Sequence, residues 1–258
     1  MDFDAILVCG HGSKKKEGIQ AFVQLAEKMG KRYSQTKVEY GFLELAKPDY
    51  HEAIKKLYDQ GYRRIMAVPV FLFSGVHMNY EIPEMMQEFQ NEMEGLEISL
   101  APNVGISDEL IQLAEKRIIE ADYDRYGKSI DHTDDLLLTI GVGSSVSDAN
   151  ADIAKLSRYI WEKNNFGFSE YAFISKMTFP SVQDVLEIIR NMPFKRIVAL
   201  PLLLFPGLYL DKVFMAIEDF RKEVNKEVIF AEPFGPDDLL LDILEKRMQE
   251  AGTVSSKQ

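Results

Sequence analysis

The chain has 258 residues, of which 46% are hydrophobic and 28% are charged, a composition typical of soluble globular proteins. Lys and Arg number 30 against 41 Asp and Glu, so the net charge is −11, and nucleic acids and anionic membranes are disfavoured as partners. The single cysteine, Cys9, excludes an intrachain disulfide, no apolar run is long enough for a membrane span, and the acidic first residues lack the basic region of a signal peptide. We therefore expect a cytoplasmic protein with one large domain or two ordinary ones.

The first half of the chain alternates apolar strand patterns with amphipathic helix patterns. The run over 64–71 is apolar without alternation, which is typical of a strand covered on both faces. Pro48-Asp49 and Ser107-Asp108 have the chemistry of helix starts. The predicted strands are 5–9, 37–43, 64–71 and 96–101, and the predicted helices are 18–34, 48–59, 79–93 and 107–125.

The polar segment 124–135 is interpreted as a linker, because the same alternation begins again after it. Pro180-Ser181 opens a helix in this second half, with Asp184 placed as a capping-box partner. The predicted strands are 136–140, 171–177, 196–205 and 228–231, and the other predicted helices are 148–163, 211–224 and 237–249.

The two halves form an internal repeat. Three scaffold residues recur at an offset of 132, Pro48 as Pro180, Pro69 as Pro201 and Gly75 as Gly207 (180−48, 201−69, 207−75). The first glycine loop recurs at an offset of 131 (141−10), so one residue was gained or lost in between. A repeat this long indicates a duplicated domain rather than a solenoid. We predict an α/β fold with tandem domains over 1–126 and 127–258, each a parallel sheet flanked by helices, with a cleft between them.

Three polar side chains follow predicted strands in the first half. His11 lies in the Gly10-His11-Gly12-Ser13 loop, Glu44 follows the second strand, and His77 follows the third. Ligands of open parallel sheets bind beyond the carboxyl ends of the strands, so the three side chains are expected to converge there. Two imidazoles and a carboxylate suit either a transition metal with open coordination positions or proton transfer near neutral pH.

Neighbouring residues are weighed in the same way. The run Lys14-Lys15-Lys16 is either a solvated face or an attraction for a polycarboxylate or phosphate ligand. Cys9 is interpreted as a core residue, and His51 and His132 as bystanders. Neither a dinucleotide-binding glycine motif nor a P-loop is present, so no nucleotide is expected. We assign ligand-binding roles to five residues of the two loops, namely Gly10, Gly12, Ser13, Lys14 and Gly75.

The second copy keeps the Pro and Gly scaffold but lacks the polar residues. By sequence offset, His11 corresponds to Val142, Glu44 to Lys176 and His77 to Tyr209. Drift between duplicated halves is one explanation. The preferred interpretation is that one copy kept a site while the other became a wall of the cleft.

Four motifs together resemble the sirohydrochlorin chelatase family, the ATP-independent iron and cobalt chelatases of siroheme and cobalamin synthesis. They are Gly10-His11-Gly12-Ser13, the segment 42–48 around Glu44, the segment 68–77 that ends at His77, and Glu81-Ile82-Pro83-Glu84. The resemblance covers nearly the whole chain. It implies two similar α/β domains with the tetrapyrrole in the cleft between them, and a metal site at His11 and His77 with Glu44 as its acidic residue.

The resemblance also implies a reaction, the insertion of Fe²⁺ or Co²⁺ into sirohydrochlorin, and the motifs do not decide between the two ions. Two alternatives stay open: a non-catalytic metal or tetrapyrrole carrier, and a protoporphyrin ferrochelatase of the same superfold. The sequence leaves open whether the protein is a monomer or a homodimer.

Overall fold

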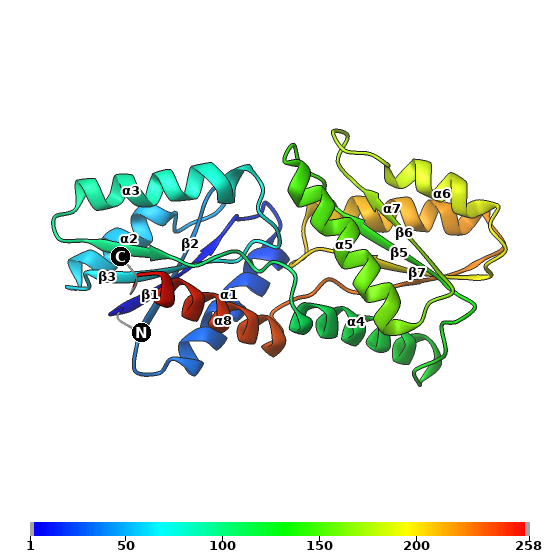
Figure 1. Cartoon of the computed structure of the whole chain (residues 1–258), viewed down its shortest axis with the longest axis horizontal. Helices are drawn as coiled ribbons and strands as arrows, with labels where there is room; N and C mark the ends of the chain where they lie inside the picture. Colours follow the sequence, from blue (N-terminus) through cyan, green and yellow to red (C-terminus); the bar gives the residue numbers. More distant parts are fainter. Residues whose placement is uncertain (1–2, 256–258) are drawn as a thin grey trace. The chain divides into compact units, whose positions relative to one another are not determined.

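Both halves of the chain fold as parallel α/β sheets in the computed structural model, which describes residues 3–255 (Figure 1). Within those residues, each sheet has four strands, in the orders β2-β1-β3-β4 and β6-β5-β7-β8. All neighbouring strands run parallel. The strands are β1 (Ala5–Gly10), β2 (Lys37–Phe42), β3 (Arg64–Pro69), β4 (Glu97–Leu100), β5 (Leu136–Gly141), β6 (Phe168–Phe173), β7 (Arg196–Pro201) and β8 (Glu227–Phe230).

Helices connect successive strands, as parallel pairing requires. The predicted fold class, two similar parallel α/β sheets flanked by helices, is confirmed. The helices are α1 (Lys16–Arg32), α2 (Tyr50–Asp59), the π-helix η1 (His77–Glu81), α3 (Ile82–Glu92), α4 (Asp108–Tyr126), α5 (Ser147–Asn164), α6 (Val182–Arg190), α7 (Leu208–Glu223) and α8 (Asp238–Ser255). No helix within residues 3–255 combines the length and the apolar character needed to cross a bilayer.

The central strands explain the uninterrupted apolar runs in the sequence. All residues of β1 are buried, and so are those of β3 after its first residue, because helices cover both faces of the sheet. On one face, Leu7 of β1 packs with Tyr50 and Ile54 of α2 and with Phe89 of α3. Each such side chain contributes about 1.5–3 kcal/mol through burial, so the core holds the strand ends in fixed positions.

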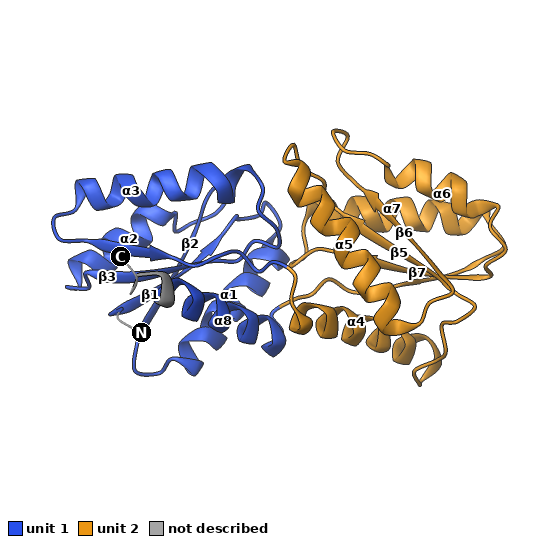
Figure 2. Cartoon of the chain, viewed as in Figure 1, with its two compact units in different colours: residues 1–105, 236–258 blue, residues 106–235 orange. Residues whose placement is uncertain are grey.

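The compact units do not coincide with the sequence repeat (Figure 2). Unit 1 comprises residues 1–105 and 236–258, and unit 2 comprises residues 106–235. Helix α4, which follows β4 in the first repeat, packs on β7 and β8 of unit 2, whereas α8 packs on β3 and β4 of unit 1. The predicted boundaries, 1–126 and 127–258, follow the repeat and therefore miss this exchange of terminal helices.

An equivalent arginine fastens each exchanged helix to its unit. In unit 2, Arg117 of α4 donates to the carbonyl oxygen of Phe234 at 2.6 Å. In unit 1, Arg247 of α8 donates to the carbonyl oxygen of Val104 from Nε at 3.0 Å and from Nη2 at 2.8 Å. These carbonyl groups lie just beyond the edge strands, so each arginine ties a helix to the segment that leaves its sheet.

We expect Arg247→Met to lower the free energy of unfolding by about 2 kcal/mol, because the Val104 carbonyl loses charge-assisted hydrogen bonds. Gln249→Ala, at an exposed position of the same helix, is expected to stay within about 0.5 kcal/mol of the parent. Urea denaturation measures both values. Equal stability of the two variants would contradict a fastening role for Arg247.

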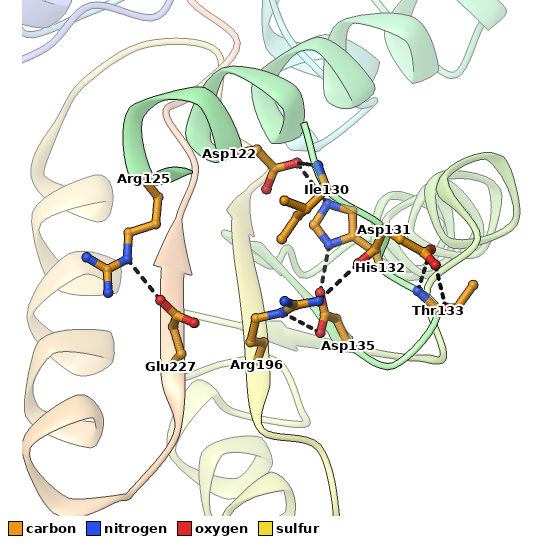
Figure 3. Close-up of polar contacts among 9 residues, drawn as sticks. All are labelled: Asp122, Arg125, Ile130, Asp131, His132, Thr133, Asp135, Arg196 and Glu227. Atoms are coloured by element: carbon orange, nitrogen blue, oxygen red, sulfur yellow. Dashed lines mark hydrogen bonds and ion pairs between the residues drawn. The ribbon is translucent and has the colours of Figure 1, made fainter. Parts of the chain in front are cut away.

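The segment interpreted as a linker is held in place by contacts of His132 with two carboxylates (Figure 3). The His132 imidazole is buried and contacts two buried carboxylates: Nε2 lies 3.1 Å from Oδ2 of Asp122, and Nδ1 lies 2.9 Å from Oδ2 of Asp135. Arg196 Nε donates to the other oxygen of Asp135 at 2.8 Å. The imidazole thus joins the end of α4 to the start of β5, and His132 is a structural residue rather than a bystander.

The charges of this cluster support one another. Burial alone would lower the pKa of His132, but hydrogen bonds and charge attraction from Asp135 and Asp122 raise it. For Asp135 the directions are reversed. Burial alone would raise its pKa, but the contacts with His132 and Arg196 lower it. The protonated imidazole and the ionised carboxylate are therefore the forms that the fold favours.

Because the folded state raises the pKa of His132, its stabilisation is full below the unfolded pKa of about 6.5 and is lost as the pH rises through the folded value. Asp135 acts in a separate window, since its lowered pKa gives stabilisation that is lost only as the pH falls below about 4. We expect the stability of the parent protein to decrease as the pH rises above about 6.5. His132→Gln is expected to be about 3 kcal/mol less stable at pH 6 and to lack this decrease. Denaturant titrations across the pH range test this, and parallel pH profiles for the two proteins would refute it.

Candidate functional site

The first glycine loop lies against the end of β2. The N–H of Glu44 donates to the carbonyl oxygen of His11 at 3.0 Å, which continues the parallel pairing beyond the strand ends. Gly12 has φ +97°, and a Cβ atom at this position would lie 1.8 Å from the carbonyl oxygen of Glu44. Only glycine combines this backbone angle with so close an approach, so Gly12 allows His11 and Glu44 to meet.

Gly10 has a packing role as well. A Cβ atom at Gly10 would lie 2.6 Å from the ring of Phe22, and its carbonyl oxygen accepts a hydrogen bond from the buried Tyr50 hydroxyl at 2.8 Å. Beyond the loop, the Ser13 hydroxyl accepts the N–H of Lys15 at 3.0 Å, immediately before α1. The ligand contacts assigned to Gly10, Gly12, Ser13 and the exposed Lys14 stay predictions.

The loop after β3, which leads to His77, is held by backbone hydrogen bonds and by the side chain of Asn103. Gly75 donates to the carbonyl oxygen of Phe73 at 3.0 Å and accepts from the N–H of Asn79 at 3.1 Å. The side chain of Asn103 accepts from the Ser74 hydroxyl at 2.9 Å and donates to the Leu72 carbonyl at 3.1 Å. These bonds fix the path of the chain into η1, at whose first residue His77 lies.

His11, Glu44 and His77 meet at the carboxyl edge of the sheet of unit 1. The rings of His11 and His77 lie edge to face, with centroids 5.0 Å apart and an interplanar angle of 78°. Nε2 of His11 lies 3.6 Å from Oε1 of Glu44. The side chains of His11, Glu44 and His77 are 40%, 54% and 38% exposed, so the site is open to a ligand. The structure therefore places these residues as the sequence predicted, and their catalytic roles stay predictions.

The surroundings of His11 favour its neutral form. Burial lowers the pKa of His11, the nearby His77 lowers it further, and Glu44 and Glu81 oppose the shift without reversing it. A neutral imidazole has a free lone pair at pH 7, and it can use this pair to bind a metal ion or to accept a proton.

Glu81 is a residue of this site for which the sequence predicted no individual role. Its Oε2 lies 2.7 Å from Nδ1 of His77, one turn earlier on the same segment. The spacing of four residues from His77 is the signal that indicates this contact, since residues four apart share a helix face. Phe71 is a second residue beside the site to which the sequence motifs gave no individual role. Its ring centroid lies 6.2 Å from that of His11.

Metal-binding residues are few at this edge. Among residues 3–255, no three His, Cys, Asp or Glu side chains are arranged to hold a metal ion together. Cys9 is fully buried in the core and burial raises its pKa, which confirms its interpretation as a core residue. A metal ion at this edge would therefore rely on the His11 and His77 imidazoles and on ligands from outside the protein.

The second copy repeats the scaffold without this chemistry. Gly143 has φ +88° at the position of Gly12, and Val142 replaces His11. Ser175, whose N–H donates to the carbonyl oxygen of Val142 at 2.9 Å, is the structural counterpart of Glu44. The assignment of Lys176 to that position was wrong, because the extra residue of the second copy lies between this hydrogen bond and Pro180.

Unit 2 contains a basic hollow of about 900 Å³ beside the starts of β7 and β8, which is the amino edge of its sheet. Two of its cations have partners within the fold: Arg125 contacts Glu227 at 2.9 Å, and Lys226 donates to the carbonyl oxygens of Met192 and Phe194 at 2.6 Å each. Arg125 lies in the last turn of α4 and Lys226 shortly after the end of α7, where positive charge offsets the helix dipole. All of its lining residues belong to unit 2, whereas His11 belongs to unit 1.

The fold and the site define a class: a duplicated parallel α/β protein whose first copy presents two imidazoles and a carboxylate at the carboxyl edge of its sheet. The CbiX family matches residues 5–121 and 136–251, one match in each half of the chain. The chain therefore belongs to the CbiX family, which confirms the resemblance inferred from the motifs.

Two curated relatives from Priestia megaterium align with nearly the whole chain. One, a sirohydrochlorin ferrochelatase, is 26% identical over 95% of this chain and 90% of its own length. The other, a sirohydrochlorin cobaltochelatase, is 25% identical over 95% of this chain and 79% of its own length. A solved structure of SirB from Bacillus subtilis with Fe³⁺ shares the fold, with a TM-score of 0.85 and 22% identity over 98% of this chain and 97% of that one.

We expect Gly12→Ala to destabilise the protein by about 3 kcal/mol, from backbone strain together with displacement of the Glu44 loop. Gly61→Ala is a matched control, because Gly61 has φ +94° with no atom within 4 Å of an added Cβ. That change is expected to cost only the strain, about 1 kcal/mol. Thermal and urea unfolding compare the two variants, and equal losses would show that the Glu44 carbonyl does not constrain position 12.

Proposed function

We propose that this protein inserts Fe²⁺ or Co²⁺ into sirohydrochlorin without ATP, and that the reaction takes place at His11, Glu44 and His77. The observation that carries the proposal is the convergence of two imidazoles and a carboxylate, all accessible, at one edge of the sheet of unit 1. Relatives of both names, ferrochelatase and cobaltochelatase, support both metals as substrates.

The proposed reaction needs a metal ion that is held weakly and then released. Because burial lowers the pKa of His11, its imidazole is neutral at pH 7 and presents a lone pair. His11 and His77 bind the substrate ion through two nitrogen atoms, which leaves the remaining coordination positions for the macrocycle nitrogens. Few protein ligands mean that transfer to the macrocycle is not blocked.

Insertion also requires the removal of two protons from the pyrrole nitrogens. In the proposed reaction Glu44, 54% exposed and 3.6 Å from His11, accepts one of them, and the His11 imidazole accepts the other once the metal ion has left its lone pair. The exposed Lys14 and Lys16 supply positive charge beside the same loop for the carboxylates of the substrate, an attraction that added salt weakens. The cytoplasmic location and the monomer or homodimer state stay predictions.

We expect His11→Ala and His77→Ala each to lower the rate of metallation at least about 100-fold, because each removes a ligand and a proton acceptor. His51→Ala is the control, since His51 is exposed on α2 and its ring packs beside Phe89. The measurement is anaerobic metallation of sirohydrochlorin with Fe²⁺ and Co²⁺, followed by absorbance.

Circular dichroism and thermal unfolding establish that the three variants are folded. Many turnovers in the parent protein with near-complete loss in both site variants support the enzyme. Binding of one equivalent of metal without turnover would instead favour a carrier. Unchanged rates in folded His11→Ala and His77→Ala would refute the assigned site.

A further inference from the structure

The segment that carries His77 has an unusual backbone with an identifiable cause. The N–H of Ile82 donates to the carbonyl oxygen of His77, five residues earlier, which is the bond that defines a π-helix. Pro83 follows and has no N–H to donate to the carbonyl of Asn79, and its ring would clash with that carbonyl in a regular α-helix. The wider π turn accommodates the proline.

The second copy supplies an internal comparison. Met215 occupies the position of Pro83, and α7 is a continuous α-helix over Leu208–Glu223. Tyr209 and Val213 occupy the positions of His77 and Glu81. The π turn, the histidine and the glutamate therefore occur together in one copy and are replaced together in the other.

The contact between Glu81 and His77 decides which ring nitrogen is available. An ionised carboxylate can only accept hydrogen bonds, so at 2.7 Å from Oε2 of Glu81 the Nδ1 atom of His77 carries the proton. The Nε2 atom then keeps its lone pair. In metal sites, a carboxylate on the second nitrogen of a ligating imidazole fixes the tautomer and the orientation of the ring in this way.

We propose that Glu81 is a positioning residue: it holds His77 as the Nδ1–H tautomer with its Nε2 lone pair turned toward the substrate metal ion, and the π turn at Pro83 sets the approach of the two side chains. This inference rests on the proposed function, whose metal site includes His77. Glu81 contacts neither of the other site side chains through a hydrogen bond that the structure describes, so it acts through His77. Both side chains of the pair are partly exposed, so the contact between Glu81 and His77 contributes little to the stability of the fold. Its main effect is on the orientation of His77 in the site.

Three variants separate positioning from mere helix stabilisation. Glu81→Ala removes the acceptor, Glu81→Gln keeps a neutral amide oxygen that accepts the Nδ1 proton, and Glu88→Ala removes an exposed carboxylate farther along α3. We expect Glu81→Ala to bind Co²⁺ 10- to 100-fold more weakly and to have a higher KM for the metal with an unchanged KM for the tetrapyrrole. Glu81→Gln is expected to recover most of the affinity, and Glu88→Ala to match the parent.

The direct readout is the tautomer of His77, observed by ¹⁵N–¹H correlation of the imidazole nitrogens in the metal-free protein and assigned with His77→Gln. The proposal predicts the Nδ1–H form in the parent and in Glu81→Gln, and a mixture of forms in Glu81→Ala. The same tautomer in all three proteins, or equal Co²⁺ affinity of Glu81→Ala and Glu88→Ala, would overturn it. Failure of the proposed function is distinct, because a parent protein that neither binds Co²⁺ nor metallates sirohydrochlorin still reports the tautomer of His77.

Discussion

The site depends on the contact between two loops at the carboxyl edge of the first sheet. Gly12 passes directly over the Glu44 carbonyl, and the Glu44 N–H binds the His11 carbonyl, so the ends of β1 and β2 continue as one hydrogen-bonded unit. The buried core behind them fixes both strands. A residue with a side chain at position 12 cannot adopt this arrangement, so the backbone of the two loops brings the His11 imidazole and the Glu44 carboxylate together.

The second copy shows that scaffold and chemistry are separable. Gly143 keeps the positive φ angle and the close packing of its loop, although Val142 and Ser175 stand where the first copy has His11 and Glu44. The backbone of the edge therefore persists without the groups that would bind a metal ion or a proton. The exchanged helices α4 and α8, each fastened by an arginine, keep both sheets covered, so loss of the site in one copy leaves its fold intact.

Much of this structure is predictable from sequence because its signals are local. Apolar runs define the strands, the recurring Pro and Gly residues reveal the duplication, and parallel strands place His11, Glu44 and His77 at one edge. The exchange of α4 and α8 is not predictable in this way, because the two helices have similar amphipathic patterns and nothing local indicates which sheet each one covers. The position of the inserted residue, between Ser175 and Pro180, likewise appears only in the hydrogen bonds.

Two further residues show the limit of reasoning from residue type. His132 lies in a polar segment that is typical of a linker, yet it is buried between Asp122 and Asp135, because tertiary packing overrides the local pattern. Glu81 belongs to a recognised motif, but its residue type alone does not indicate its contact with His77, which lies within the π turn before Pro83. For His132 the informative feature is its pair of buried carboxylate partners, and for Glu81 it is the irregular backbone of the π turn.

The proposed function requires that the substrate metal ion binds at His11 and His77 of unit 1. The most direct measurement is an anomalous difference map from crystals of the protein soaked with Co²⁺, collected on both sides of the cobalt absorption edge. We predict a peak within bonding distance of one nitrogen of each of these two imidazoles. A peak confined to unit 2, or to carboxylates away from the carboxyl edge of the first sheet, would contradict the claim.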